Sequence, residues 1–284
     1  MGRKLEPLLG GIVFPEAPRW HDGVLWFSDM FARRVMIVSI TGHAKVIAEL
    51  DDEPSGLGFL QDGTPLVVLM NRRQIVRLDG SKVRVHADLS HFPATFLNDM
   101  VVDSNGRAYV DNIVRRAKGD TGSDKIVLVE PDGYSRVAAD NEEFSLMETP
   151  NGLVMTPDQK TLIFASTGHY RLAAMSIEAD GSLSRPRVFA ETPGAAPDGI
   201  CLDAEGAVWV GGLDSNQFLR VRDGGQVVES ISMGDRLAVA CLLGGPDRRT
   251  LFLLSARGQR GHLRERSEGF IDVVSVDVPG AGWP

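Results

Sequence analysis

The sequence predicts an all-β chain, and within that class a six-bladed β-propeller in which residues 1–284 form a single domain. Two observations lead to this prediction. Short apolar, β-branched runs alternate with polar turns that contain Asp-Gly or Asn-Gly, which is the pattern of strands joined by tight hairpins. A unit of four such runs then recurs along the chain, with no long amphipathic helical pattern between the units.

The recurring unit has the length of a propeller blade. The residues that open its first strand are Glu16, Ser55, Asn98, Asn151, Asp198 and Ala240, and they are 39, 43, 53, 47 and 42 residues apart. Spacings of this size are typical of propeller blades, whereas a solenoid, the alternative, would favour shorter and more uniform repeats. We expect residues 8–14 to add a strand to the last blade and so close the ring.

The composition argues against two kinds of partner, nucleic acids and membranes. The formal net charge is −8, which argues against a nucleic-acid partner. No apolar run approaches the roughly 20 residues of a membrane-spanning helix, and the first residues lack a clear signal-peptide cleavage site. We therefore expect a cytoplasmic protein without a membrane partner. Cys201 and Cys241 lie in apolar runs and are expected to be buried thiols.

Several local catalytic motifs are absent from the sequence. It contains no phosphate-binding loop, no Gly-x-Ser-x-Gly nucleophile elbow, no His-Glu-x-x-His and no Cys-x-x-Cys. Any active site must therefore be assembled from residues that are distant in the sequence.

The propeller repeat itself suggests where such a site lies. The first strand of each blade runs beside the central channel, so its opening residues converge at one mouth of that channel. Four of the six carry oxygen ligands, namely Glu16, Asn98, Asn151 and Asp198. Two carboxylates and two amide oxygens suit one divalent cation, Ca²⁺ in the first place, with Mg²⁺, Mn²⁺ or Zn²⁺ as alternatives. The competing interpretation is that these residues only serve strand-entry turns.

These residues also carry a family resemblance. The chain resembles the SMP-30/gluconolactonase/luciferin-regenerating-enzyme (LRE) family in four stretches that lie in order along the chain: Pro15–Trp20, Leu97–Asp103, Pro150–Leu153 and Pro197–Asp203. The resemblance implies a six-bladed propeller with one divalent cation. It implies that Glu16, Asn151 and Asp198 are metal ligands, and that Asn98 binds the metal, its water or the substrate.

One position departs from the members of this family that hydrolyse sugar lactones. The resemblance implies that those members carry an arginine two residues before the Asn of the Asn-Asp pair, and that this arginine contacts the polar substrate. In this chain the residue at that position is Phe96. If Phe96 lines the pocket, the substrate is predicted to be less polar than a sugar lactone; the alternative is that Phe96 packs under its loop. The residues expected to line its pocket with Phe96 and Asn98 are Met30, Met100, His169 and Tyr170. The Arg- and Gly-rich segment 256–269 is a candidate lid.

The function predicted from these residues is metal-dependent hydrolysis of a small-molecule lactone or related ester. The cation would polarise the carbonyl group, and Asp198 would act as the general base. His169 could donate a proton to a carbonyl or leaving oxygen, or simply bond within its own blade. Two alternatives keep the fold: a metal-dependent phosphoester hydrolase, lyase or isomerase, and a non-enzymatic calcium-binding propeller.

Overall fold

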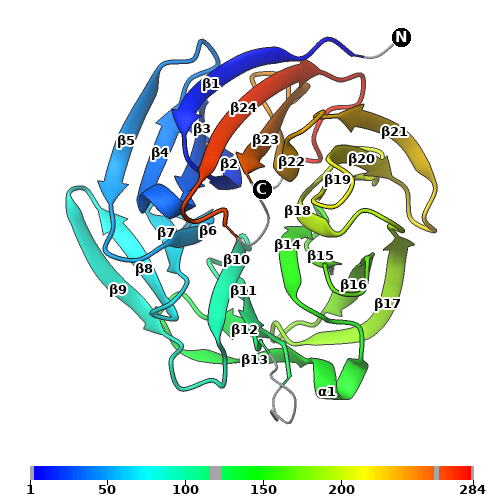
Figure 1. Ribbon diagram of the computed structural model, residues 1–284. Coiled ribbons are helices and arrows are strands. Elements are labelled where there is room, and N and C mark those ends of the chain that lie inside the picture. Colours follow the sequence, from blue (N-terminus) through cyan, green and yellow to red (C-terminus); the bar gives the residue numbers. More distant parts are fainter. Residues whose placement is uncertain (1–2, 116–122, 259–261, 283–284) are drawn as a thin grey trace.

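The computed structural model describes residues 3–115, 123–258 and 262–282. These residues form six four-stranded antiparallel sheets arranged as blades around a central axis (Figure 1). The innermost strands of successive blades contact one another all the way round, from the first blade to the sixth and back to the first. The predicted six-bladed propeller is therefore confirmed.

The strands follow the predicted repeat. Blade 1 contains β2 (Pro15–His21), β3 (Val24–Asp29), β4 (Arg34–Val38) and β5 (Ala44–Glu49). Blade 2 contains β6 (Pro54–Phe59), β7 (Pro65–Leu69), β8 (Gln74–Asp79) and β9 (Lys82–Asp88). Blade 3 contains β10 (Phe96–Val102), β11 (Ala108–Ile113), β12 (Lys125–Val129) and β13 (Ser135–Asp140).

The second half repeats this order. Blade 4 contains β14 (Pro150–Met155), β15 (Thr161–Ser166), β16 (Arg171–Ile177) and β17 (Leu183–Glu191). Blade 5 contains β18 (Pro197–Leu202), β19 (Val208–Gly212), β20 (Gln217–Val221) and β21 (Val227–Ser232). Blade 6 contains β22 (Leu237–Gly244), β23 (Thr250–Gly258), β24 (Ser267–Ser275) and β1 (Glu6–Ile12). The described helices are a 3₁₀ turn at Met30–Ala32 and α1 (Asn141–Phe144); neither is long and apolar enough to cross a membrane.

The last blade is closed by the first strand of the chain. β1 pairs antiparallel with β24 as its outermost strand, which confirms the expected closure, although the strand covers Glu6–Ile12 rather than residues 8–14. The next two residues turn inward instead. The backbone N–H groups of Val13 and Phe14 each donate to Asp29 Oδ1 at 2.9 Å, and Arg34 holds the other oxygen of that carboxylate from 2.8 Å. The closing strand is thus anchored to blade 1 as well as to blade 6.

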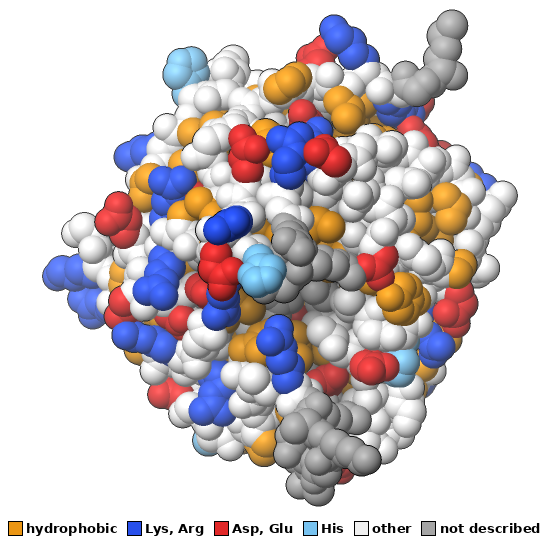
Figure 2. All heavy atoms as spheres, viewed as in Figure 1, with side chains coloured by type: hydrophobic (Ala, Val, Ile, Leu, Met, Phe, Trp, Pro, Cys, Tyr) orange, Lys and Arg blue, Asp and Glu red, His pale blue; other side chains and the backbone are white. Residues whose placement is uncertain are grey.

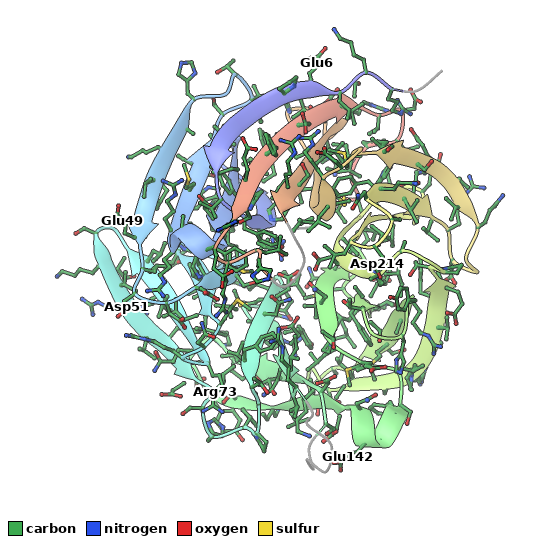
Figure 3. The ribbon with its side chains drawn as sticks, viewed as in Figure 1. Glu6, Glu49, Asp51, Arg73, Glu142 and Asp214 are labelled. Atoms are coloured by element: carbon green, nitrogen blue, oxygen red, sulfur yellow. The ribbon has the colours of Figure 1, made fainter. Side chains whose placement is uncertain are left out.

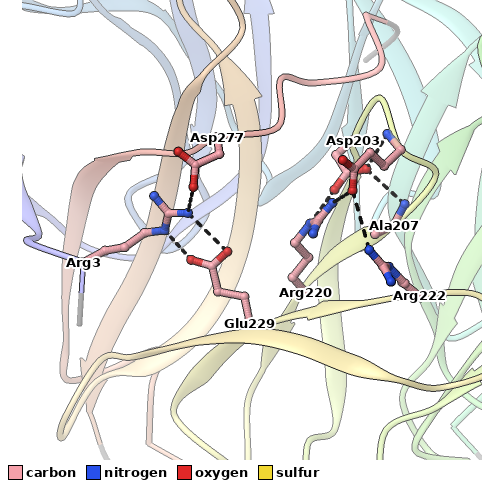
Figure 4. A network of polar contacts seen from close by, with 8 residues as sticks. Arg3, Asp203, Ala207, Arg220, Arg222, Glu229 and Asp277 are labelled. Carbon is pink, nitrogen blue, oxygen red and sulfur yellow. Dashed lines mark hydrogen bonds and ion pairs between the residues drawn. The ribbon is translucent and has the colours of Figure 1, made fainter. Parts of the chain in front are cut away.

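An ionic network joins the start of the chain to blade 5. The Arg3 guanidinium contacts Glu229 on β21 and lies 2.8 Å from Asp277, just after β24 (Figure 4). In the same region, the Arg220 guanidinium donates to the fully buried carboxylate of Asp203 at 2.6 Å. Charged contacts therefore supplement the strand pairing at the point where the ring closes.

Each inner strand is irregular near its start. The pairing between the first and second strands shifts register between Glu16 and Arg19 in blade 1, and at corresponding places in the other five blades. A β-bulge of this kind bends the strand and redirects its side chains. The same irregularity therefore recurs at the residues that the sequence repeat aligned.

Glycines let the inner strands approach one another at this level. A Cβ atom added to Gly152 would lie 2.6 Å from the Asp198 carbonyl oxygen, and one added to Gly199 would lie 2.4 Å from the Ala240 Cβ. Asn-Gly and Asp-Gly at these positions thus serve close packing inside strands rather than turns. Nearby, the free thiols of Cys201 and Cys241 are both buried, with their sulfur atoms 3.8 Å apart, as predicted.

Candidate functional site

The four predicted ligand residues lie at equivalent positions near the start of four inner strands. Glu16 is on β2, Asn98 on β10, Asn151 on β14 and Asp198 on β18. Glu16, Asn98 and Asp198 are buried and Asn151 is half-buried. The four residues come from the innermost strands of four separate blades. The charge of Asp198 acts on Glu16, and Asn98 and Asn151 line one cavity.

The group is strongly acidic. Burial, followed by the charges of Asp198 and Asp99, raises the pKa of Glu16 well above its ordinary value. Asp111 is also fully buried, and burial together with Asp99 raises its pKa in the same direction. Arg19 is a cation within this group: its Nη2 lies 3.4 Å from Asp99 Oδ1 and also donates to the Met100 carbonyl. Removing so many carboxylates from water is costly unless a further cation compensates them.

Hydrogen bonds fix the two carboxamides. The Ser55 hydroxyl donates to Asn98 Oδ1 at 3.0 Å, and the Asn98 backbone N–H donates to Asp111 Oδ1 at 2.7 Å. Asn151 Oδ1 accepts the N–H of Gly152 at 2.9 Å. Each amide oxygen can accept a second interaction. Ser55, the residue that opens the first strand of the second repeat unit, thus holds the Asn98 carboxamide in place.

The backbone is strained beside two of these side chains. Ala17, directly after Glu16, has a φ of 47°, and Thr149, two residues before Asn151, has a φ of 53°. Residues with a Cβ rarely adopt this left-handed region, least of all β-branched ones. Thr149 is held there because its N–H donates to the buried Asp124 carboxylate at 2.8 Å. Strain of this kind is commonly retained where side-chain direction serves a site.

The donor set fits a hard divalent cation. Among the described ranges, no three His, Cys, Asp or Glu side chains converge as a metal cluster. The set at the channel instead combines the carboxylates of Glu16 and Asp198 with the carboxamides of Asn98 and Asn151. Oxygen-only donors of mixed charge suit Ca²⁺ or Mg²⁺ better than the softer metals.

A cavity of about 620 Å³ opens beside these residues. Of the residues that the sequence assigned to the site, Met30, Phe96, Asn98 and Asn151 line it, whereas Glu16 and Asp198 are buried and do not. Its apolar wall also includes Phe31, Met70, Ile113, Leu213 and Leu263. Hydrophobic side chains show near the centre of this face, with charged ones around them (Figure 2).

Three of the expected pocket residues are not among those that line the cavity. Met100 is fully buried in a core cluster between blades, because it follows the bulge of β10 and so faces the blade interior. Tyr170 is 39% exposed, and its hydroxyl donates to Asp214 at 2.6 Å, a residue of the β19–β20 turn (Figure 3).

His169 is the third expected pocket residue that does not line the cavity. Its Nδ1 lies 3.1 Å from the Ser166 hydroxyl and its Nε2 lies 3.3 Å from Glu148. This resembles a Ser-His-acid arrangement, but the Ser166 side chain is fully buried and its oxygen already accepts the Glu148 N–H at 2.9 Å. The geometry is that of a histidine bonded within its own blade.

Sequence reasoning missed several polar residues of the cavity. They come from loops and from the residue just before β6: Glu53, Asn71, Thr95, Arg115, Thr149, Thr167, Arg264 and Glu265. The blade repeat does not align them, since loops differ in length from blade to blade. A search for charged residues in the loops at this end of the ring would have found the two arginines.

The predicted lid segment contributes directly to the cavity. Leu263, Arg264 and Glu265 line it, and Arg264 Nη2 lies 2.5 Å from Glu53 Oε2 across the mouth. Within two loops of this face, residues 116–122 and 259–261 lie outside the described residues. Whether the segment moves stays a prediction.

Comparisons with known proteins agree with this architecture. The chain is 25% identical over 282 residues to the 6-deoxy-6-sulfogluconolactonase of Pseudomonas putida, covering 96% of this chain and 94% of that protein. It is 22% identical over 251 residues to regucalcin of Xenopus laevis, covering 85% and 82% of the two chains. The solved structure of the calcium-binding protein regucalcin from Agrobacterium tumefaciens superposes with a TM-score of 0.81 at 19% identity, covering 100% of this chain and 97% of that one.

The family model described as the SMP-30/gluconolactonase/LRE-like region matches residues 14–257, a span that begins just before Glu16 and includes all four channel residues. With the propeller, the aligned channel residues and this match together, the chain belongs to the SMP-30/gluconolactonase/LRE-like family.

Proposed function

We propose that this protein is a divalent-metal-dependent lactonase that hydrolyses a lactone or a related carboxylic ester. The observation that carries the proposal is the acidic set around Glu16 and Asp198, buried at one level of the channel next to a cavity large enough for a small molecule. Membership of the SMP-30/gluconolactonase/LRE-like family and the similarity to the 6-deoxy-6-sulfogluconolactonase of P. putida support a lactone substrate.

The proposed mechanism assigns one role to each channel residue. Glu16, Asn98, Asn151 and Asp198 would hold the cation, and when bound it supplies a Lewis acid that polarises the lactone carbonyl. Asp198 takes the proton of the attacking water as general base, and its burial keeps bulk water from competing for that contact. Glu16 neutralises charge, and the two carboxamides complete the shell without adding charge.

Ca²⁺ is the proposed ion. All four donors are oxygens, two are neutral, and such sets are typical of calcium sites. The calcium-binding description of the A. tumefaciens structure agrees with this choice. Mg²⁺, Mn²⁺ and Zn²⁺ are the alternatives to be compared in the same assay.

The proposed substrate carries an apolar portion and is less polar than a sugar lactone. Phe96, Met30 and Leu213 line the cavity with apolar surface that cannot satisfy sugar hydroxyls. An unmatched buried polar group costs about 1–3 kcal/mol, so each such hydroxyl should lower binding about tenfold.

The test is a lactone panel after chelation and metal addition. With Ca²⁺ restored, we expect kcat/KM for an alkyl γ-lactone to exceed that for glucono-δ-lactone, and we expect chelator to abolish both activities. Full activity in chelator would contradict the metal dependence, and preference for gluconolactone would contradict the apolar substrate. Glu16→Gln, which keeps the shape but removes one charge, serves as the metal-deficient control.

A further inference from the structure

Two arginines line the cavity, and their partners differ. Arg264 lies in the turn before β24, and its Nη2 pairs with Glu53 Oε2 at 2.5 Å. Arg115 follows β11, and within residues 3–115, 123–258 and 262–282 no carboxylate pairs with it. Of the two guanidinium groups, the Arg115 group is therefore the one whose charge is uncompensated by the described part of the chain.

Arg115 makes one contact through its backbone and one through its guanidinium group. Its backbone N–H donates to Thr95 Oγ1 at 2.9 Å, and its guanidinium carbon lies 5.0 Å from the centroid of the Phe96 ring. A guanidinium stacked on an aromatic face keeps its N–H groups free at the edge for other acceptors. The ring of Phe96 thus supports a cation as well as forming apolar wall.

The same strand links this cation to the channel residues. Phe96 precedes Asn98 by two positions on β10, and alternate residues of a strand lie on one face roughly 7 Å apart. A small ligand whose carbonyl lies beside Asn98 can therefore reach the guanidinium with a substituent on its ring.

The two acidic residues that line the cavity have partners other than Arg115, so the charge of Arg115 is available to a ligand. Glu53 is already paired with Arg264, and Glu265 Oε2 lies 2.9 Å from His262 Nδ1. The carboxylates of Glu16 and Asp198 are buried, and their proposed partner is the cation rather than Arg115. The mouth near Phe96 is therefore suited to an anionic group.

We propose that Arg115 is a specificity-determining residue that binds a carboxylate carried by the lactone substrate. Its planar fork can donate two parallel hydrogen bonds to a carboxylate. This inference rests on the proposed lactonase function and adds the substrate class: a lactone whose ring carries no hydroxyls against Phe96 and bears one carboxylate at Arg115. The lower polarity proposed above thus applies to the ring and not to this substituent.

The test compares a charged lactone with its neutral isostere. The probes are 5-oxotetrahydrofuran-2-carboxylate and the corresponding carboxamide, assayed with Ca²⁺ at low salt. We expect wild type to favour the carboxylate in kcat/KM by about tenfold or more, the usual scale of a hydrogen-bonded charge pair. Arg115→Gln should bring the ratio close to one, and Arg115→Lys should keep part of it.

Two further variants separate charge from position. Phe96→Leu keeps an apolar wall and the full charge but removes the ring, so the ratio should fall to an intermediate value. Arg72→Gln removes a surface charge from a loop of the same face. Arg72 pairs at 2.6 Å with Asp51, which lies toward the outer side of the ring (Figure 3), and the variant should leave the ratio unchanged.

A binding measurement distinguishes this inference from the lactonase proposal. Pyroglutamate and its amide are the lactam counterparts of the two probes and resist hydrolysis, so calorimetry can report binding alone. Hydrolysis of both lactones at a ratio near one, with pyroglutamate binding equally to wild type and Arg115→Gln, would overturn the role of Arg115 and leave the lactonase. Absent hydrolysis with Arg115-dependent pyroglutamate binding would overturn the lactonase and leave the carboxylate site. Loss of Arg115 dependence in both measurements overturns the present inference.

Discussion

At the scale of single residues, Asp198 offers the clearest test of the proposed chemistry. Asp198→Asn keeps the size and one oxygen donor of the side chain but cannot accept the proton of water. We expect turnover to fall about a hundredfold or more, because general-base catalysis commonly contributes that much. Elemental analysis of the same sample should still find the cation. Near-normal turnover would assign the deprotonation to another group.

The raised pKa of Glu16 predicts that the stability of the metal-free protein depends on pH. Its pKa is raised by burial and by Asp198, well above the ordinary value of 4.5, so the folded state binds the proton more tightly than the unfolded state does. Its contribution to stability is therefore present below pH 4.5 and is lost as pH rises towards its folded pKa. In chelator, the melting temperature should fall as the pH rises above 4.5.

Added Ca²⁺ should reverse that trend, because cation binding requires the deprotonated carboxylate. The matched control is Glu16→Gln, in which the slope in chelator should flatten. Asp111 titrates in the same direction and is expected to leave a residual slope. A melting temperature that rises with pH in chelator would contradict the proposed coupling of Glu16 to Asp198.

At the scale of elements, the close packing of inner strands is testable at Gly199. A Cβ added at this position would lie 2.4 Å from the Ala240 Cβ, so Gly199→Ala must push β18 and β22 apart. We expect a loss of about 1–3 kcal/mol in the free energy of unfolding, measured by denaturant titration. Cation affinity should fall as well, since Asp198 is the preceding residue.

Gly10→Ala is the control for that substitution. Gly10 is on β1, and an added Cβ meets nothing within 4 Å. Its effect should stay within about 0.5 kcal/mol. Equal effects of the two variants would show that the contact between β18 and β22 does not constrain the site.

The elements also show how far the sequence predicts this structure. The recurrence of a unit of about 40 to 50 residues from Glu16 to Asp198 reflects a repeated packing unit, so it predicts the blades and the four channel residues. Met100 was assigned to the pocket, but the bulge before it changes which face it occupies, and alternation alone does not show a bulge. Arg115 was not found because its position depends on a loop path that no repeat constrains.

At the scale of the whole molecule, ring closure predicts a large effect of removing the first strand. Deletion of residues 1–12 leaves β24 as an unpaired edge and exposes the surface that Leu8, Leu9 and Ile12 cover. At about 1–3 kcal/mol for each apolar side chain, we expect the melting temperature to fall by about 10 °C.

A peptide can show whether pairing itself is responsible. A synthetic peptide of residues 3–14 added to the truncated protein should restore part of the melting temperature, and a scrambled peptide should not. Unchanged stability after truncation would mean that the ring is held closed by the contacts between β22 and β2 alone.

The pairing of β1 with β24 also has a consequence for synthesis. β1 ends at Ile12, and its partner begins only at Ser267. At roughly 5–20 residues per second, a ribosome needs on the order of 10 to 50 seconds to make the intervening chain. Throughout that time the first strand has no partner within its own molecule, so the nascent chain must keep β1 from pairing elsewhere until the last blade emerges.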